Sequence, residues 1–279
     1  MAYESILVQL DGNRQAMQRL QIAARLATAS QCPLIGLLAG RVPDPSWFYR
    51  MNNAQRCLAE DQERRRLQRE NMRCAFEAAT RELAVACDWR TVERDPVTLA
   101  LREAREAGLI VSGQYDADNA EGPVARQLLE ALLLESGRPA LVVPCAGAFA
   151  TVGTRVLVAW NGSREAARAL HDALPLMAGA RARVRVLSAH AGREPRADAT
   201  PVSHAVHMLE RQGVAVDVEH GPGGGDLAIG ELILTRASDF DADLIVMGAY
   251  GHGRLRELVL GGVTRVVLES MTVPVLFSH

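Results

Sequence analysis

The sequence repeats itself once over almost its full length, and this repeat constrains the fold more than any other feature. Ser5–Asn13 (SILVQLDGN) resembles Thr154–Ser163 (TRVLVAWNGS), and Gly108–Tyr115 (GLIVSGQY) resembles Asp243–Tyr250 (DLIVMGAY). A third pair, LLLESGRPALVV and VVLESMTVPVLF, follows in the same order. Three similar segments in one order indicate the duplication of a whole domain rather than a short solenoid repeat.

We place the two domains at residues 1–146 and 152–279. The segment Pro144–Gly153 (PCAGAFATVG) between them is small, rich in glycine and alanine, and without hydrophobic periodicity, which is typical of a linker. The chain has 279 residues, 48% of them hydrophobic, so each half is long enough to bury a core of its own. We find no apolar run of the ~18 residues that a membrane span needs. The first residues, MAYESILVQLDG, resemble a strand rather than a secretion signal.

Within each copy, short apolar runs alternate with segments of helical periodicity. The runs of the first copy are Ile6–Leu10, Leu34–Leu38, Arg90–Glu93, Leu109–Ser112 and Leu141–Val143. Those of the second copy are Arg155–Ala159, Val184–Ser188, Val214–Val218, Leu244–Met247 and Val275–Phe277. Strands separated by helices indicate βαβ units and a parallel sheet. We therefore expect an α/β protein made of two repeated doubly wound domains, each with a five-stranded parallel sheet.

Polar residues mark where several helices should begin. Ser163 precedes REAARALHDALPLM, and Asp95-Pro96 combines a capping oxygen with a proline at the first helical position. The first copy carries 15 more residues than the second between matching positions. We assign the surplus to Asp44–Leu83, which is typical of one long, heavily charged helix. We expect its charged residues to form a solvent-exposed face with i,i+4 ion pairs.

The composition excludes several kinds of chemistry. All 31 basic residues are arginine, so the Walker phosphate loop, protein-kinase chemistry and pyridoxal phosphate enzymes, which need a lysine, are ruled out. A net charge of −2 offers no basic footprint for nucleic acid. The five cysteines are scattered without a CxxC motif, which fits reduced thiols in the cytoplasm.

One glycine-rich segment carries the strongest functional signal. MGAYGHGRLRELVLGGVTR, Met247–Arg265, follows the apolar run DLIVM. Glycine permits positive φ and a close approach of ligand to backbone, which we expect of Gly248 and Gly251 where the strand ends and of Gly261 and Gly262 where the last helix begins. The unpaired N–H groups and partial positive charge of a helix N-terminus then form an anion cradle without any lysine.

Side chains near this cradle could add contacts to phosphate. Arg254 and Arg256 offer charge-assisted hydrogen bonds, and the Thr264 hydroxyl lies one turn into the helix. The competing interpretation is that the glycines only make turns and allow tight packing of helix on sheet. Gly251-x-Gly253 is not the dinucleotide fingerprint, because it follows the fourth strand and lacks a third glycine.

At these residues the chain resembles the universal stress protein family in its tandem, two-domain form. Nucleotide-binding members carry Gly-x2-Gly-x9-Gly followed by Ser or Thr, and Gly248, Gly251 and Gly261 match this pattern. The next residue here is Gly262, whereas Val263-Thr264 and Val273-Pro274 agree with the family. The resemblance implies an adenine nucleotide alpha hydrolase-like fold with strand order 3-2-1-4-5 in each domain.

The resemblance also implies that the second copy binds ATP or a related adenine nucleotide, with or without Mg²⁺. The nucleotide-binding residues would be Ala159, Asn161, Val186, Met247, Gly248, Gly251, His252, Gly253, Arg254, Gly261, Gly262, Val263 and Thr264. The family usually has an aspartate at the end of the first strand. The first copy keeps it as Asp11, whereas the second has Asn161, which hydrogen-bonds a ribose hydroxyl more weakly than a carboxylate does.

The corresponding loop of the first copy departs from the pattern. Asp116 stands where Gly251 would align, and Gln127 where Gly261 would. Asp116, Asp118 and Glu121 would repel a triphosphate. We therefore expect the first copy not to bind nucleotide through this loop.

Other candidate sites have weaker signals. His204-x2-His207, with His190 and His220, could hold zinc, but no ligand spacing supports a metal site. HGPGGGDLAIGELI, beginning at His220, resembles a phosphate loop but is interpreted as a flexible connector whose Asp226 or Gly225 starts the next helix. We find no catalytic nucleophile, and His252 is more typical of a phosphate contact than of a catalyst.

The sequence thus predicts a cytoplasmic, stress-response regulatory protein that binds nucleotide in its second domain, with at most slow ATP hydrolysis. Two alternatives stay open: a ligand-free interaction scaffold, and a weak ATPase or phosphotransferase that uses His252. We expect the two copies to pack as a pseudo-twofold dimer within the chain, and pairing of two chains into a homodimer stays open. No nucleic acid and no membrane is expected as a partner.

Overall fold

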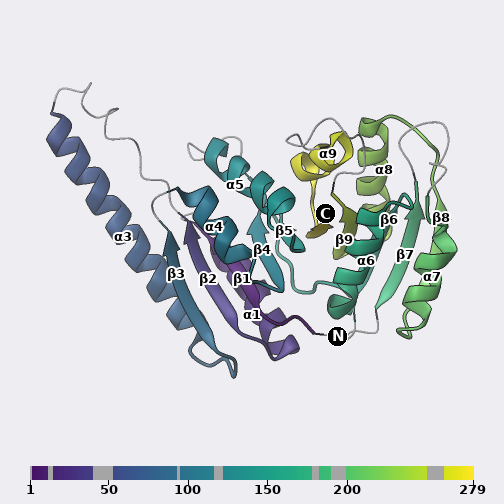
Figure 1. Ribbon diagram of the computed structural model, residues 1–279, viewed down its shortest axis with the longest axis horizontal. Helices are drawn as coiled ribbons and strands as arrows, with labels where there is room; N and C mark the ends of the chain where they lie inside the picture. Colours follow the sequence, from purple (N-terminus) through teal and green to yellow (C-terminus); the bar gives the residue numbers. More distant parts are fainter. Residues whose placement is uncertain are drawn as a thin grey trace.

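The computed structural model describes residues 2–11, 15–39, 53–92, 95–115, 122–177, 182–189, 199–249 and 261–279. In these residues the strands form one ten-stranded sheet with the order β3-β2-β1-β4-β5-β10-β9-β6-β7-β8 (Figure 1). The two repeats therefore share a single sheet, and helices cover both of its faces.

The first repeat forms one half of this sheet. Its elements in chain order are β1 (Ile6–Leu10), α1 (Ala16–Ser30), β2 (Leu34–Ala39), α3 (Ala54–Thr80), β3 (Cys87–Val92), α4 (Pro96–Ala104), β4 (Leu109–Gly113), α5 (Gly122–Glu135) and β5 (Ala140–Val143). The four pairings among its strands are parallel.

The second repeat forms the other half in the same way. Its elements are β6 (Arg155–Trp160), α6 (Arg164–Met177), β7 (Arg183–Ser188), α7 (Val202–Glu210), β8 (Ala215–His220), α8 (Asp226–Asp239), β9 (Leu244–Gly248), α9 (Gly262–Ser270) and β10 (Val275–Ser278). Its four strand pairings are also parallel. Only β5 and β10 pair antiparallel among the described strands, and they join the halves.

The core lies in two layers, one on each face of the sheet. Central strands such as β1 and β9 are apolar almost throughout, because both of their faces are covered. One layer packs against α1, α3, α6 and α7, and the other against α4, α5, α8 and α9. Phe76, for example, belongs to the first layer and Phe277 to the second. This arrangement is that of doubly wound domains.

The predicted fold class is confirmed, with order 3-2-1-4-5 in each half of the sheet. The third strand of the first copy begins at Cys87, earlier than the predicted Arg90, and the helix expected within Asp44–Leu83 spans Ala54–Thr80. The first residues of this strand, Cys87, Asp88 and Trp89, do not form an apolar run, because most residues of this outer strand are partly or fully exposed. The division at residues 1–146 and 152–279 stays a prediction.

The segment between the repeats is fixed by hydrogen bonds. Gln18 Nε2 donates to the carbonyl of Gly147 at 2.9 Å, and Arg25 Nη2 donates to that of Phe149 at 2.7 Å. Gly147 has φ 107° and Gly153 has φ 92°, a backbone conformation that side chains oppose. Glycine is therefore needed in this linker for its shape.

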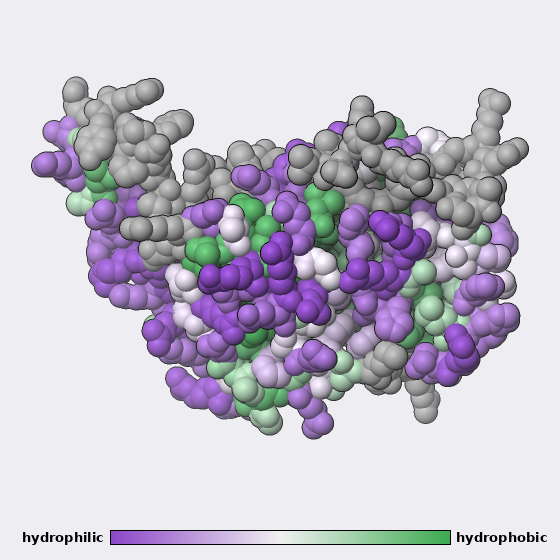
Figure 2. Space-filling model, viewed as in Figure 1, coloured by the Kyte–Doolittle hydropathy of each residue, from purple (hydrophilic) through white to green (hydrophobic). Residues whose placement is uncertain are grey.

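Helix α3 lies along the outside of the first repeat and confirms the expected charged helix (Figure 1). Ion pairs at i,i+4 join Arg56 to Glu60, Arg66 to Glu70 and Arg73 to Glu77. Hydrophilic side chains dominate the left edge of the surface in Figure 2, where this helix lies. Exposed pairs of this kind contribute little to stability and keep the helix soluble.

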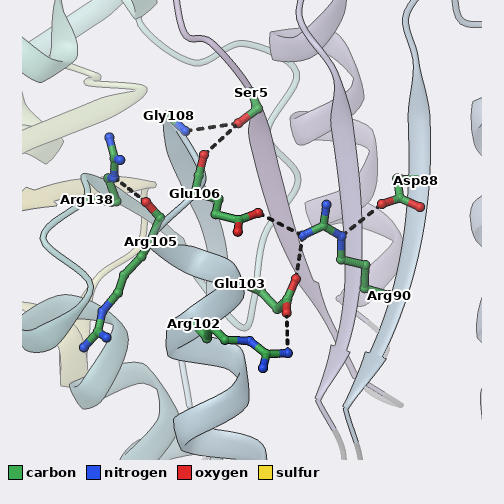
Figure 3. Close-up of polar contacts among 9 residues, drawn as sticks. All are labelled: Ser5, Asp88, Arg90, Arg102, Glu103, Arg105, Glu106, Gly108 and Arg138. Atoms are coloured by element: carbon green, nitrogen blue, oxygen red, sulfur yellow. Dashed lines mark hydrogen bonds and ion pairs between the residues drawn. The ribbon is translucent and has the colours of Figure 1, made fainter.

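A polar network ties α4 to the outer strand of the sheet (Figure 3). Arg90 on β3 donates to Asp88 at 2.9 Å and forms ion pairs with Glu103 and Glu106. Burial of Glu103 opposes its ionisation, but hydrogen bonds from Arg90 and Arg102 outweigh this, so its pKa lies below the usual value. The nearby hydrogen bond from the Gly108 amide to Ser5 Oγ lies where β1 and β4 begin.

We predict that Phe76→Ala detaches α3 from the sheet. Phe76 is 3% exposed, lies 5.3 Å from the ring of Trp89 and leaves no room for a side chain at Gly36. The cavity should lower the free energy of unfolding by about 3 kcal/mol in urea titrations. Leu67→Ala, on the same helix but 46% exposed, is the control and should change stability little. Equal effects of the two changes would contradict the prediction.

Candidate functional site

The carboxyl ends of β6 and β9 form the point where the strand order of the second repeat reverses. Ala159 of β6 pairs with Met247 of β9, and the chain leaves the two strands toward α6 and α9. Ligands of doubly wound sheets bind outside such a reversal. The residues that surround it determine what the second repeat can hold.

The turn after β6 is built by short polar side chains. Asn161 Oδ1 accepts a hydrogen bond from the Ser163 amide at 3.1 Å, and Ser163 Oγ accepts one from the Ala166 amide at 3.2 Å. The predicted start of this helix at Ser163 is therefore confirmed. Gly162 has φ 73°, and a Cβ there would lie 2.8 Å from that of Ala199, so the turn requires glycine.

Glu165 fills the space between this turn and β9. Its side chain lies mostly buried in the first turn of α6. Burial raises the pKa of Glu165, but hydrogen bonds from Arg164, its own amide and Ser163 outweigh this and leave the pKa below its usual value. The ionised Glu165 carboxylate thus already interacts with the N-terminus of α6, so this helix end attracts a second anion only weakly.

Gly248 packs against α6 rather than facing an open space. A Cβ on Gly248 would lie 2.7 Å from the Ala166 amide nitrogen and 2.8 Å from the Glu165 Cβ. Backbone at that distance excludes any larger residue. For Gly248 the tight-packing interpretation is therefore correct, and its glycine is explained without a ligand.

The N-terminus of α9 differs from that of α6, because no described side chain caps it. Its N-cap is Gly261, and a Cβ there would meet no atom of the described residues within 4 Å. Thr264 lies in the first turn of α9 with 3% exposure. Backbone N–H groups without a described side-chain cap, and space beside Gly261 that no described residue fills, make this end of α9 suited to an anion.

The expectation of positive φ in the glycine motif is wrong for the three described members. Gly261 has φ −58°, and neither Gly248 nor Gly262 is among the described residues with positive φ. Gly248 serves helix packing, as shown above. Gly262 serves another close contact, described next, so sterics rather than backbone chirality selects glycine at both positions.

Gly262 lies against Asp226, the first residue of α8. A Cβ on Gly262 would lie 2.7 Å from the Asp226 Cβ, and closer still to its carboxylate oxygen Oδ2. Further along the same pair of helices, a Cβ on Gly230 would lie 2.7 Å from that of Val266. The two glycines allow α8 and α9 to pack closely. The family pattern has a serine or threonine after its third glycine. At position 262 such a side chain would clash with Asp226.

The remaining predicted site residues fall into three groups. Ala159 and Asn161 are partly exposed at the reversal, and Val263 is partly exposed on α9. Met247 is 4% exposed, and Val186, in strand β7, is fully buried. Gly251, His252, Gly253, Arg254 and Arg256 lie outside the described residues.

The first repeat fills the equivalent point with an arginine. Arg19 of α1 is 1% exposed, and its Nη2 lies 2.6 Å from Asp11 Oδ1. Its Nε donates to the Gln9 carbonyl at 3.2 Å, and its Cζ would lie 2.9 Å from a Cβ on Gly113. The Asp11 carboxylate at the end of β1 is therefore paired with the guanidinium of Arg19.

Sequence reasoning missed this arginine, although a signal existed. Arg19 interrupts the apolar face formed by Ala16, Leu20 and Ala23, and it follows Asp11 by eight residues. The matching position in the second repeat is Ala169, which is small and buried. A lone arginine on a buried helix face needs a partner, and the nearest carboxylate in sequence supplies it.

The acidic loop and the histidines of the sequence analysis can be placed only in part. Asp116, Asp118, Glu121 and His190 lie outside the described residues, whereas Gln127 is exposed on α5. His204 and His207 are exposed on α7, and His220 is exposed at the end of β8. Within the described parts of the chain, no three His, Cys, Asp or Glu residues come together as a metal site, and no helix is long and apolar enough to cross a membrane.

Comparisons with known proteins agree with the repeat and the fold. The model of the universal stress protein family matches twice, at residues 2–144 and 154–279. Universal stress protein Slr1230 of Synechocystis sp. is 32% identical over 150 residues, which are 53% of this chain and about half, 49%, of that protein.

Solved structures resemble the whole chain. A universal stress protein from Archaeoglobus fulgidus DSM 4304 has a TM-score of 0.70 at 17% identity, with 99% of this chain and 98% of that chain covered. A putative universal stress protein from Pseudomonas aeruginosa UCBPP-PA14 has a TM-score of 0.61 at 20% identity, covering 99% and 93%. At these identities the likeness concerns the fold.

We predict that Gly248→Ala destabilises the protein and that Gly261→Ala does not. The added methyl at position 248 would press on the α6 backbone, whereas the one at 261 enters open space. Overpacking of this kind costs about 2 kcal/mol, measured as a loss in the free energy of unfolding. Equal stability of the two variants would show that α6 does not pack on Gly248 in solution.

We also predict that Arg19→Met lowers the free energy of unfolding by about 3 kcal/mol, because it leaves the Asp11 carboxylate without its guanidinium. Adding Asp11→Asn should restore part of the loss, since the uncompensated charge is then gone. Arg102→Met is the control, as this side chain is 70% exposed. Additive losses in the double variant would contradict a direct coupling of Arg19 and Asp11.

Proposed function

Because the chain belongs to the universal stress protein family, we propose that its second repeat binds ATP or a related adenine nucleotide, with the phosphates at the N-terminus of α9. The protein would act as a regulatory binding protein whose nucleotide state sets its shape or partners. The single observation that supports this most is the uncapped start of α9 at Gly261.

The capping of the two helices that follow the strand reversal favours α9 over α6 as the phosphate site. The N-terminus of α6 is served by Ser163 and by the Glu165 carboxylate. That of α9 has no side-chain cap among the described residues. A phosphate oxygen would accept hydrogen bonds from the free N–H groups of its first turn.

The nucleoside would lie across the ends of β6 and β9, as the family resemblance implies. Asn161 uses its Oδ1 to accept from Ser163, so only its Nδ2 remains to donate to a ribose hydroxyl. An aspartate would instead accept from ribose. With Asn161 at this position, we expect the phosphate contacts to contribute more to the binding free energy than the ribose contacts.

The first repeat should not bind a second nucleotide. Arg19 lies against Asp11 and Gly113, where the ligand of the second repeat would lie in the equivalent position. A ligand could enter here only if Arg19 moved away from Asp11. Separating a buried ion pair costs more free energy than separating an exposed one, because it leaves an uncompensated charge. We expect one nucleotide per chain.

We propose binding rather than turnover, because the sequence contains no recognisable catalytic nucleophile motif. Slow hydrolysis through His252, which lies outside the described residues, is the competing enzyme hypothesis. The five cysteines are free, which is compatible with a cytoplasmic location.

The test is calorimetry with ATP, ADP, AMP and adenosine on two variants at the start of α9. Gly261→Asp and Gly261→Asn both place a cap where space is open, and each should stabilise the helix by a few tenths of a kcal/mol. Only the aspartate adds charge, so it alone should weaken ATP binding, by about tenfold, while adenosine affinity is unchanged.

The wild-type protein should bind one ATP per chain. No heat with any of the four compounds at millimolar concentration would reject the proposal in favour of a ligand-free scaffold. Turnover of ATP that disappears in His252→Ala would favour the enzyme instead. Equal ATP affinity of the two Gly261 variants would place the phosphates elsewhere.

A further inference from the structure

The C-terminal end of α9 is held by a side chain of the first repeat. Gln114, which directly follows β4, donates from Nε2 to the Leu268 carbonyl at 2.6 Å. Leu268 is among the last four residues of α9, whose carbonyls have no hydrogen-bond partner within the helix. Gln114 therefore caps a helix that lies 154 positions further along the chain.

The amide group of Gln114 is fixed from both sides. Its Oε1 accepts a hydrogen bond from the Cys145 amide at 3.0 Å, and the residue is only 8% exposed. The backbone amide of Gln114 donates to the Val143 carbonyl at 2.8 Å. A side-chain amide that both donates and accepts has one orientation. Gln114 thus ties α9 to the chain that leaves β5 toward the second repeat.

Helix α9 lies between α8 and the first repeat (Figure 1). On the side of α8, Val266 packs so closely on Gly230 that a Cβ there would lie 2.7 Å from that of Val266. On the side of the first repeat, the Tyr115 hydroxyl lies 3.5 Å from Glu269 Oε1 and adds a longer contact to that of Gln114. A helix of nine residues is marginal by itself, so these neighbours determine where it lies.

The second repeat does not return this contact. In the aligned segments GLIVSGQY and DLIVMGAY, Gln114 corresponds to Ala249, which has no side-chain donor or acceptor. Ala249 therefore cannot cap α5 as Gln114 caps α9. The link runs in one direction, from the repeat whose strand reversal is filled by Arg19 to the repeat that we propose for the nucleotide.

We propose that Gln114 is a positioning residue for the nucleotide site, through which the first repeat and the site influence each other. The inference rests on the proposed function of the α9 N-terminus and adds the regulation of that site. Because α9 is a rigid rod about 13 Å long, a shift of its C-terminal end also moves its N-terminal amides relative to β6 and β9. Gln114 acts on the phosphates only through the position of α9.

A coupling of this kind works in both directions, because the two equilibria are linked. A phosphate bound to the first turn of α9 would stabilise the helix in the position that Gln114 caps. Local opening of the chain around Gln114 should then be rarer in the nucleotide-bound protein. Cys145 can report this opening, since its amide is bonded to Gln114 and its side chain is partly exposed.

A purely structural role for Gln114 makes a different prediction. If the residue only stabilised the contact between the repeats, Gln114→Met would lower the melting temperature and leave the nucleotide affinity of the folded protein unchanged. ATP would then have no effect on the reactivity of Cys145.

The first experiment is calorimetry with ATP and adenosine on the wild-type protein and on Gln114→Met. Methionine keeps the length of the side chain and removes both the donor and the acceptor. ATP affinity should fall about fivefold, a typical size for coupling between separate sites. Adenosine affinity should be unchanged, because only the phosphates contact α9.

The second experiment measures how fast a thiol reagent labels Cys145, with and without ATP, by mass spectrometry of peptides. In the wild-type protein ATP should slow the labelling by a similar factor, about fivefold, and in Gln114→Met by much less. Cys74, which is exposed on α3, serves as the internal reference, and its labelling rate should not change.

Gln18→Met is the matched control variant. It removes a glutamine hydrogen bond to the Gly147 carbonyl of the segment between the repeats, but none to α9. It should keep the wild-type affinities for ATP and adenosine. Melting temperatures of both variants show that they fold.

The outcomes separate this inference from the proposed function. Wild-type ATP affinity in Gln114→Met, or an equal loss of ATP and adenosine affinity, would overturn the inference and leave the site standing. If Gln114→Met does not fold, the wild-type protein decides, and labelling of Cys145 that ignores bound ATP overturns the inference. If neither ATP nor adenosine binds to the wild-type protein, the proposed function fails and takes the inference with it.

Discussion

The antiparallel pairing of β5 with β10 is the interaction on which the architecture depends. Val275 pairs with Val142 and Leu276 with Leu141, and all four side chains are buried. Each repeat alone would leave its fifth strand as an unpaired apolar edge, a template for aggregation. Pairing the two equivalent strands removes both edges at once and relates the repeats as a local twofold axis would. The pseudo-dimer expected from the sequence stays a prediction.

Side-chain hydrogen bonds also connect the first repeat to α9, the helix that begins at the candidate site. Gln114, just after β4, donates from Nε2 to the Leu268 carbonyl of α9 at 2.6 Å, and its Oε1 accepts from the Cys145 amide at 3.0 Å. The first repeat thus holds the C-terminal part of the helix whose N-terminus we propose for phosphate. A first repeat with an arginine-filled reversal point is suited to this supporting role, because its own structure needs no ligand.

The periodic features of the sequence predict the architecture well, because they arise from burial. Apolar runs give the strands, and Ser163 and Asp95 give the helix starts with the hydrogen bonds expected of them. The joining of the two sheets is not encoded in any one segment. Burial of β5 and β10 is apparent from their composition, but their mutual pairing depends on how two complete domains meet.

The candidate site is less predictable, because its glycines look alike in sequence and differ in space. Among the described glycines of the motif, Gly248 packs on α6, Gly262 packs on Asp226, and Gly261 has no described atom beside it. The motif alone suggests a ligand contact at each of these glycines, whereas the structure leaves space for one at Gly261. Asp226, assigned to a connector from its glycine-rich surroundings, becomes notable only when α8 is seen beside α9.

The two repeats show how charge is balanced at one point of a fold in two ways. Asp11 persists in the first repeat together with Arg19, whose guanidinium forms an ion pair with its carboxylate. The second repeat has neither, since Asn161 and Ala169 are neutral, but it places Asp226 beside the start of α9. A buried ion pair is permanent, because separating it leaves an uncompensated charge. Asp226 is exposed, so its charge is in contact with solvent instead. The internal arginine of the first repeat, which has no counterpart at Ala169, is the reason why we propose the nucleotide for the second repeat.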